Sequence, residues 1–274
     1  PYVSKVIQRM RKVYVVTIEQ VKDYAFGHPS DTRLHTNFFI PGRSLNGAIQ
    51  GDKVLVELKS WDSHDDAPLG HVVKVLGQEG DNDVEMHAIL AEYGLPLEFP
   101  PEVEQEAKQF TPSAESKAGL DKKEIAKRRD MRDVLTMTID PADAKDFDDA
   151  LSLKKLKNGN YEVGIHIADV SYYVKPGSAI DAEAIGRATS VYLVDRTIPM
   201  LPEVLSNDLC SLRPNEDKFA FSAVFEMDED ANVIKEWFGR TVIHSDRRFA
   251  YEDAQVRLET GEGDLADELA LMFK

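Results

Sequence analysis

Residues 138–151 read Thr-Ile-Asp-Pro-Ala-Asp-Ala-Lys-Asp-Phe-Asp-Asp-Ala-Leu, so five aspartates fall within the ten positions from Asp140 to Asp149. Alternating apolar residues typical of buried strands lead into this acidic segment and out of it. A solvated acidic loop does not usually lie between two strands that belong to a core. We therefore expect the aspartates to lie together at the edge of a sheet.

The chemistry of this acidic segment favours divalent cations. Crowded carboxylates raise one another's pKa unless a cation neutralises them. Oxygen-only ligands select hard cations, Mg²⁺ with Mn²⁺ as the alternative, and two such ions about 3.5–4 Å apart can clamp an in-line phosphoryl displacement. An EF-hand is excluded because, counting from Asp140, Lys145 stands where that loop needs glycine and Leu151 where it needs glutamate. Spacing alone leaves a metal site and a turn of solvated aspartates equally open.

The composition is that of an ordinary soluble protein, with 274 residues, 42% hydrophobic content and a mean hydropathy of −0.36. No apolar run approaches the ~18 residues that cross a bilayer, so we expect no membrane contact. The single cysteine, Cys210, excludes an internal disulfide and fits a reducing, cytoplasmic setting; we expect it in the core. The net charge of −16 argues against simple wrapping of nucleic acid, which usually requires clustered Lys and Arg.

We predict a multidomain α+β chain in which a small β-barrel precedes a mixed α/β domain. Residues 1–77 contain five short strands separated by turn residues, which indicates an OB-type barrel; a five-stranded piece of a sandwich is the alternative. Residues 78–130 are predicted to form a helical connecting region, with helices over 101–110 and 121–132. Basic and acidic residues interleave in the second helix, which favours a solvated face over a phosphate contact.

Residues 131–274 are predicted to form the mixed α/β domain. Asn158-Gly159 is a strong hairpin signal between two alternating segments. The other elements that we expect are a helix over 181–188, strands over 219–227 and 233–243, and a helix from Tyr251 onward. His166 lies in one of the alternating segments, and we expect it to be a structural histidine rather than a ligand.

The acidic segment closely resembles the catalytic signature of the ribonuclease II / ribonuclease R family, with ribonuclease R-type members as the better match. The order and spacing hold over more than a hundred residues. The matching segments after it are 166–171, 173–174, 176–178, 189–193, 196–203, 205–207 and 209–212. The first domain is similar to the family's second cold-shock domain at His35-Thr36, at 39–42 and at 51–54.

The resemblance implies an exoribonuclease (class EC 3.1.13) that degrades single-stranded RNA processively from 3′ to 5′, with Mg²⁺ or Mn²⁺, to nucleoside 5′-monophosphates. It assigns Asp140, Asp146, Asp148 and Asp149 to the active site. Of these, Asp140, Asp146 and Asp149 are expected to hold metal directly or through water, while the role of Asp148 stays open. Asp143 lies outside the family's acidic set and is expected to be solvated.

The same resemblance indicates where RNA would bind. Tyr192 corresponds to a tyrosine that packs against the terminal nucleotide, and a base stacked on such a ring contributes about 1–3 kcal/mol. Tyr24, Phe26 and Phe39 fall near positions where cold-shock domains stack bases, although each could equally fill the barrel core. Ala188 stands where many members have glycine, which is expected to alter a helix end.

The family's catalytic domain continues past Lys274, so we expect this chain to be a fragment with a truncated nuclease domain that is inactive alone. We also expect the protein to be a monomer. Two other functions stay open. The first is an RNA-binding module without catalysis, which would bind RNA independently of metal. The second is a phosphodiesterase acting on small nucleotides, for which long RNA would not compete.

Overall fold

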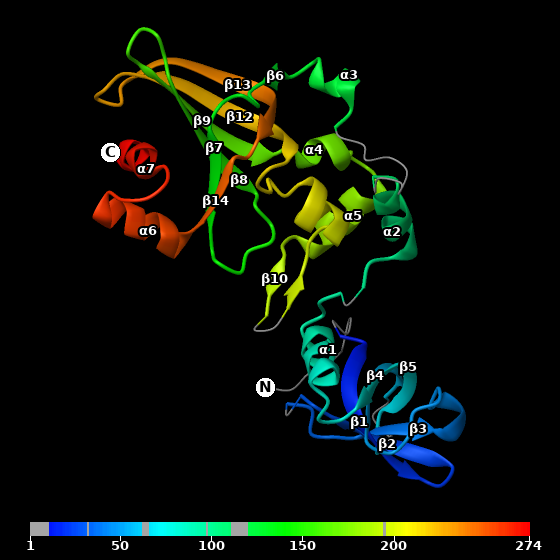
Figure 1. Ribbon diagram of the computed structural model, residues 1–274. Helices are drawn as coiled ribbons and strands as arrows, with labels where there is room; N and C mark the ends of the chain where they lie inside the picture. The colour runs from blue at the N-terminus through cyan, green and yellow to red at the C-terminus, as the bar shows by residue number, and fades with distance from the viewer. Residues whose placement is uncertain (1–10, 32, 62–65, 97, 111–119, 194–195) are drawn as a thin grey trace, which may run out of the picture. The chain divides into compact units, whose positions relative to one another are not determined.

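The computed structural model describes residues 11–31, 33–61, 66–96, 98–110, 120–193 and 196–274. The chain divides into two compact units, Pro1–Glu98 and Phe99–Lys274 (Figure 1). Within the described ranges, no helix has the length and apolar character needed to span a membrane.

The first unit is a closed five-stranded barrel with the strand order β1-β2-β3-β5-β4. Its strands are β1 Val13–Val21, β2 Tyr24–Pro29, β3 Phe38–Pro41, β4 Asp52–Ser60 and β5 Leu69–Gln78. Alternate residues such as Val54 and Val56 are fully buried and fill the barrel, as the alternating pattern requires. The predicted OB-type barrel is confirmed, and the sandwich alternative is wrong.

A helix that the sequence analysis missed, α1 (Asn82–Glu92), packs beside this barrel. The Asp81 side chain caps it by accepting hydrogen bonds from the backbone N–H groups of Asp83 and Val84, which would otherwise lack partners. Lys53 of β4 is nearly buried and forms an ion pair with Glu85 of this helix. Lys53, which belongs to the cold-shock match at 51–54, therefore helps to hold the helix on the barrel, together with the buried Val84, Ala88 and Leu90 of the helix.

The second unit is built on a seven-stranded sheet with the order β14-β7-β8-β9-β12-β13-β6 (Figure 1). The strands are β6 Arg129–Asp130, β7 Thr136–Asp140, β8 Asp149–Lys155, β9 Tyr161–Ala168, β12 Asp217–Met227, β13 Val233–His244 and β14 Arg247–Ala250. β14 runs parallel to β7 and β6 parallel to β13, while the other neighbours are antiparallel. The hairpin predicted at Asn158-Gly159 joins β8 to β9.

Helices and short irregular elements complete the second unit. They are α2 Pro101–Lys108, α3 Lys122–Ile125, α4 Val170–Tyr173, α5 Ala179–Arg187, the π-helix η2 Val204–Leu209, α6 Tyr251–Thr260, α7 Ala266–Phe273 and the two-stranded sheet of β10 Val191–Tyr192 and β11 Thr197–Ile198. α2 packs against α5 and η2, and α6 against β14. Cys210 lies in the main core, as expected.

The helix predicted over 121–132 is wrong, because α3 ends at Ile125 and Arg129–Asp130 forms β6. The solvated-face interpretation also fails for Arg128, whose side chain is fully buried. Its guanidinium forms ion pairs of 3.0 Å with Glu124 and 2.7 Å with Asp169. Tertiary pairing therefore overrides the local helical pattern, and an arginine that looked exposed becomes part of the core.

His166 lies fully buried in a line of hydrogen bonds that crosses four strands. Its Nδ1 is 2.6 Å from Ser222 Oγ and its Nε2 is 2.8 Å from Ser152 Oγ. Ser222 Oγ lies 2.6 Å from Thr241 Oγ1, and this hydroxyl donates to the carbonyl of Ala220. If Ser222 donates to Thr241, it must accept from Nδ1–H, so the neutral ring satisfies every group. His166 is therefore a structural histidine.

This buried histidine predicts a loss of stability in acid. Burial lowers the pKa of His166 from 6.5 to about 4. The unfolded chain binds a proton near pH 6.5 and the folded protein only near pH 4, so the free energy of unfolding falls as pH drops through this window, by up to about 3 kcal/mol. Urea unfolding from pH 7 to 4.5 should be less pH-dependent in His166→Gln than in wild type; equal slopes would contradict this account.

Candidate active site

The acidic segment connects β7 to β8 and brings both of its ends to one edge of the sheet. Asp140 is the last residue of β7 and Asp149 the first of β8. The two strands pair directly, with Met137 opposite Leu151, so a chain that leaves one strand returns beside it. We call the intervening residues 141–148 the carboxylate loop. The loop places the predicted aspartates together where β7 ends and β8 begins.

Asp140 is the most enclosed of these aspartates. Its side chain is largely buried, and its Oδ2 has no hydrogen-bond partner within the described residues. Burial raises the pKa of Asp140; the nearby Thr138 hydroxyl and the Arg248 charge oppose this effect in part, and the negative charges of Asp149 and Asp146 add to it. A buried carboxylate oxygen without a donor is costly. A bound cation would remove this cost.

Asp148 lies in the same electrostatic environment although the residue itself is exposed. Loss of hydration raises its pKa most, and the charges of Asp146, Asp149 and Asp140 raise it further. The four predicted aspartates are thus near enough to repel one another. Asp143 is exposed too, as expected for a solvated loop residue.

The carboxylates fit a hard divalent cation by their donor chemistry, because they offer only oxygen and share an excess of negative charge. The described part of the chain nevertheless contains no group of three or more acidic, histidine or cysteine side chains already arranged as metal ligands. The site therefore offers the ligand types and the charge for a cation without a preformed cage.

Tyr192 extends from β10 to the carboxylate loop. Its hydroxyl donates a 2.7 Å hydrogen bond to Asp146 Oδ2, while 66% of the residue remains exposed. This hydrogen bond, with burial and the charge of Asp146, raises the pKa of Tyr192 to about 12. The structure thus brings Tyr192 to the aspartates and leaves much of its ring open to solvent.

Ser211, to which the sequence analysis gave no role, holds the loop from its C-terminal side. Its buried hydroxyl donates to the carbonyl of Lys145 at 2.9 Å and accepts from the backbone N–H of Phe147 at 3.0 Å. The backbone N–H of Leu212 donates to the carbonyl of Phe147 at 2.8 Å. These bonds fix the backbone on both sides of Asp146. Only its position in the 209–212 match could have singled out Ser211.

Ala188 lies at the C-terminal end of α5, at the position where the resemblance predicts glycine. It ends α5 in the left-handed conformation, with φ 64° and ψ −27°, which glycine adopts without steric cost. Ala188→Gly should therefore stabilise the protein by about 1 kcal/mol and raise its Tm by roughly 2–4 °C. Ala182→Gly, in the interior of the same helix, should lower stability by a similar amount. Thermal unfolding of both variants tests the sign, and a lower Tm for Ala188→Gly would contradict this assignment.

In the first unit, Tyr24, Phe26 and Phe39 form an aromatic cluster on the outside of the barrel. The Tyr24 ring centroid lies 5.6 Å from that of Phe26 and 5.4 Å from that of Phe39. All three residues are half-buried, while the barrel core is made by others such as Phe38 and Ile40. The interpretation that these rings fill the core is therefore wrong, and each of the three residues keeps part of its surface exposed on the barrel.

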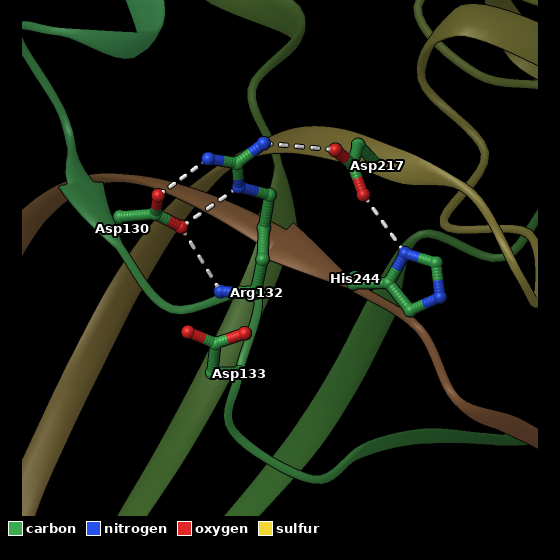
Figure 2. A pocket seen from close by; sticks show the side chains of 5 residues that line it. All are labelled: Asp130, Arg132, Asp133, Asp217 and His244. Atoms are coloured by element: carbon green, nitrogen blue, oxygen red, sulfur yellow. Dashed lines mark hydrogen bonds and ion pairs between the residues drawn. The ribbon is translucent and has the colours of Figure 1, made fainter.

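A separate polar pocket in the second unit contains none of the predicted site residues (Figure 2). Asp130, Arg132, Asp133, Asp217 and His244 line it. Arg132 forms ion pairs with Asp130 and Asp217, and Asp217 also pairs with His244. Because most of these charged side chains form ion pairs with one another at the surface, this pocket is not the candidate active site.

Comparisons with known proteins agree with this architecture. The family model of the RNB domain matches residues 128–273, and that of the cold shock domain matches residues 26–100. Ribonuclease R of Thermotoga maritima is 40% identical over 94% of this chain and 36% of its own length. The exosome complex exonuclease dis3 of Schizosaccharomyces pombe is 44% identical over 77% of this chain and 22% of its own length.

A solved structure of Mycoplasma genitalium RNase R in complex with double-stranded RNA superposes with a TM-score of 0.84 and 27% identity, over 98% of this chain and 46% of that one. The chain spans about a third or less of the length of the ribonuclease R and dis3 relatives. The RNB match covers more than half of the chain and includes the whole carboxylate loop. The chain therefore belongs to the RNB domain family, with a cold shock domain preceding its RNB domain.

Proposed function

We propose that the protein is a 3′-to-5′ exoribonuclease that hydrolyses single-stranded RNA processively to nucleoside 5′-monophosphates. The observation that carries the proposal is the convergence of Asp140, Asp146, Asp148 and Asp149 at one sheet edge, where a buried Asp140 oxygen lacks a hydrogen-bond donor. Its relatives include proteins named as an exonuclease and a ribonuclease. Because the chain spans only part of them, the proposal concerns the full-length protein.

In this proposal, Asp140, Asp146 and Asp149 hold Mg²⁺, or Mn²⁺ in its place, and Asp148 belongs to the same shell. Bound cations would supply an activated water and neutralise charge on the reacting phosphate. The protein's own residues keep the carboxylates crowded near the substrate, and the cations would favour their ionised forms. Ser211 fixes the backbone around Asp146, and the Tyr192 hydroxyl orients the carboxylate of that residue.

RNA would be recognised by aromatic stacking rather than by a strongly basic surface. The exposed ring of Tyr192 would receive the terminal base next to Asp146. The cluster of Tyr24, Phe26 and Phe39 would stack other bases on the barrel. Stacking of this kind tolerates any sequence, which suits an enzyme that removes nucleotides one after another.

Degradation of a 5′-labelled RNA with a 3′ overhang by the full-length protein tests the proposal. The expected result is a Mg²⁺-dependent ladder that collapses to a short 5′ end-product, with nucleoside 5′-monophosphates released and EDTA abolishing the reaction. RNA that is bound but uncut with both Mg²⁺ and Mn²⁺ would instead favour the second candidate, a non-catalytic RNA-binding module. The surface aromatic cluster of the barrel is the observation that favours this candidate.

A further inference from the structure

Arg248 lies on the strand next to the one that leads into the carboxylate loop. It belongs to β14, which lies beside β7 (Figure 1). The two strands are parallel, with Arg248 opposite Thr138 and Ala250 opposite Asp140. Arg248 lies outside the acidic segment and outside the family-like segments that follow it in 166–212. Its position beside the end of β7 brings its side chain to the start of the loop.

The Arg248 side chain contacts the loop at both of its ends. Its Nη2 donates to the carbonyl of Pro141 at 2.9 Å and to that of Ala142 at 2.7 Å. Its guanidinium carbon lies 5.1 Å from the centroid of the Phe147 ring, within the range of a cation–π interaction. Its Nε is buried. One planar group thus joins the first two residues of the loop to the residue that separates Asp146 from Asp148.

Phe147 is held from two directions as a result. Its backbone is bonded to Ser211 and Leu212, while its ring meets Arg248. The Arg248 charge also acts on Asp140 and favours its ionised form. Without Arg248, the carbonyls of the first loop residues lose a shared donor and the Phe147 ring loses its cation. The Ser211 contacts alone would then fix only the C-terminal half of the loop.

We propose that Arg248 is a positioning residue that holds the carboxylate loop in the shape that binds divalent cations. The part of this proposal that concerns cation binding rests on the proposed function. The part that concerns the conformation of the loop does not. Residues that support metal ligands typically change metal affinity by about 10–100-fold when removed. Lysine cannot replace Arg248 fully, because an ammonium group offers no planar fork for two carbonyls and a ring.

Direct binding of Mn²⁺, followed by electron paramagnetic resonance of the full-length protein without RNA, tests this role. Arg248→Ala should weaken Mn²⁺ binding by about 10–100-fold, and Arg248→Lys should weaken it less. Arg247→Ala is the matched control: this neighbour pairs with Asp264 at 2.8 Å and stacks on Phe249, away from the loop. It should bind Mn²⁺ as wild type does. Wild-type affinity in both Arg248 variants would overturn the proposal.

Hydrogen–deuterium exchange of the metal-free protein separates this proposal from the proposed function. In Arg248→Ala, amides of residues 141–149 should exchange faster, while those of β12 and β13 stay protected as in wild type. If the loop opens but wild type binds no Mn²⁺, the holding role stands and the proposed function fails. Unchanged exchange in the loop would refute the holding role. If Arg248→Ala loses protection throughout the sheet, the variant is unfolding as a whole and cannot report on the loop. Exchange in the loop is then compared between Arg248→Lys and wild type.

Discussion

Asp148→Asn in the full-length protein is expected to slow RNA degradation by on the order of 10²–10⁴-fold. Asp148 lies among three other carboxylates, and burial together with their charge raises its pKa. Asparagine keeps the shape of the side chain but removes its negative charge and its ability to exchange a proton. Either loss would damage a centre that orders cations and activates water. Single-turnover rates on a 5′-labelled RNA at saturating Mg²⁺ measure the effect.

The matched control is Asp143→Asn in the same loop. Asp143 is exposed and lies outside the predicted acidic set, so its replacement should change the rate by less than about 2-fold. RNA binding measured with EDTA present should be similar in both variants, because stacking and not metal provides it. Degradation that survives unchanged in Asp148→Asn would remove this residue from the active site.

Asp169→Ala is expected to lower the free energy of unfolding by about 3–5 kcal/mol. The Asp169 side chain is almost completely buried and forms a 2.7 Å ion pair with the fully buried Arg128. Burial alone would raise the pKa of Asp169, but hydrogen bonds from Ser171 and Arg128 outweigh it and lower the pKa. Removing the carboxylate leaves the Arg128 charge in the core with only part of its compensation. Urea unfolding at pH 7 measures the change.

Asp217→Ala provides the comparison for an exposed site. Asp217 forms ion pairs with Arg132 at 3.1 Å and with His244 at 2.8 Å (Figure 2), and all three side chains remain about a third exposed. Exposed pairs of this kind contribute little, so this variant should lose less than about 1 kcal/mol. Equal losses in the two variants would mean that the buried network around Arg128 does not stabilise the second unit as we argue.

Much of the fold could be predicted because local pattern and tertiary structure agree there. The short strands separated by turn residues in 1–77 predicted the barrel, and Asn158-Gly159 predicted the β8–β9 hairpin. The acidic segment between two apolar strands likewise indicated that Asp140 and Asp149 meet at a sheet edge. In these segments one face is buried, so the period of the side chains reports the structure directly.

The rest depends on contacts that are distant in sequence. α1 has no clear apolar stripe, and it is joined to the barrel in part by the pairing of Lys53 with Glu85, 32 residues apart in sequence. Arg128 stands in a charged run, yet its partner Asp169 lies on another element. Ser211 and Arg248 reach the carboxylate loop from outside it. None of these pairings has a periodic signal, so residues that position the site are harder to predict than those that form it.

The most direct test of the central claim is an anomalous difference map from crystals of the full-length protein soaked in Mn²⁺. We expect Mn²⁺ peaks bounded by the carboxylates of Asp140, Asp146 and Asp149. We expect no such peaks in the double variant that combines Asp148→Asn and Asp149→Asn. The claim would be contradicted if wild-type protein that degrades RNA bound Mn²⁺ only at other places in the crystal, and Asp140 still lacked a partner.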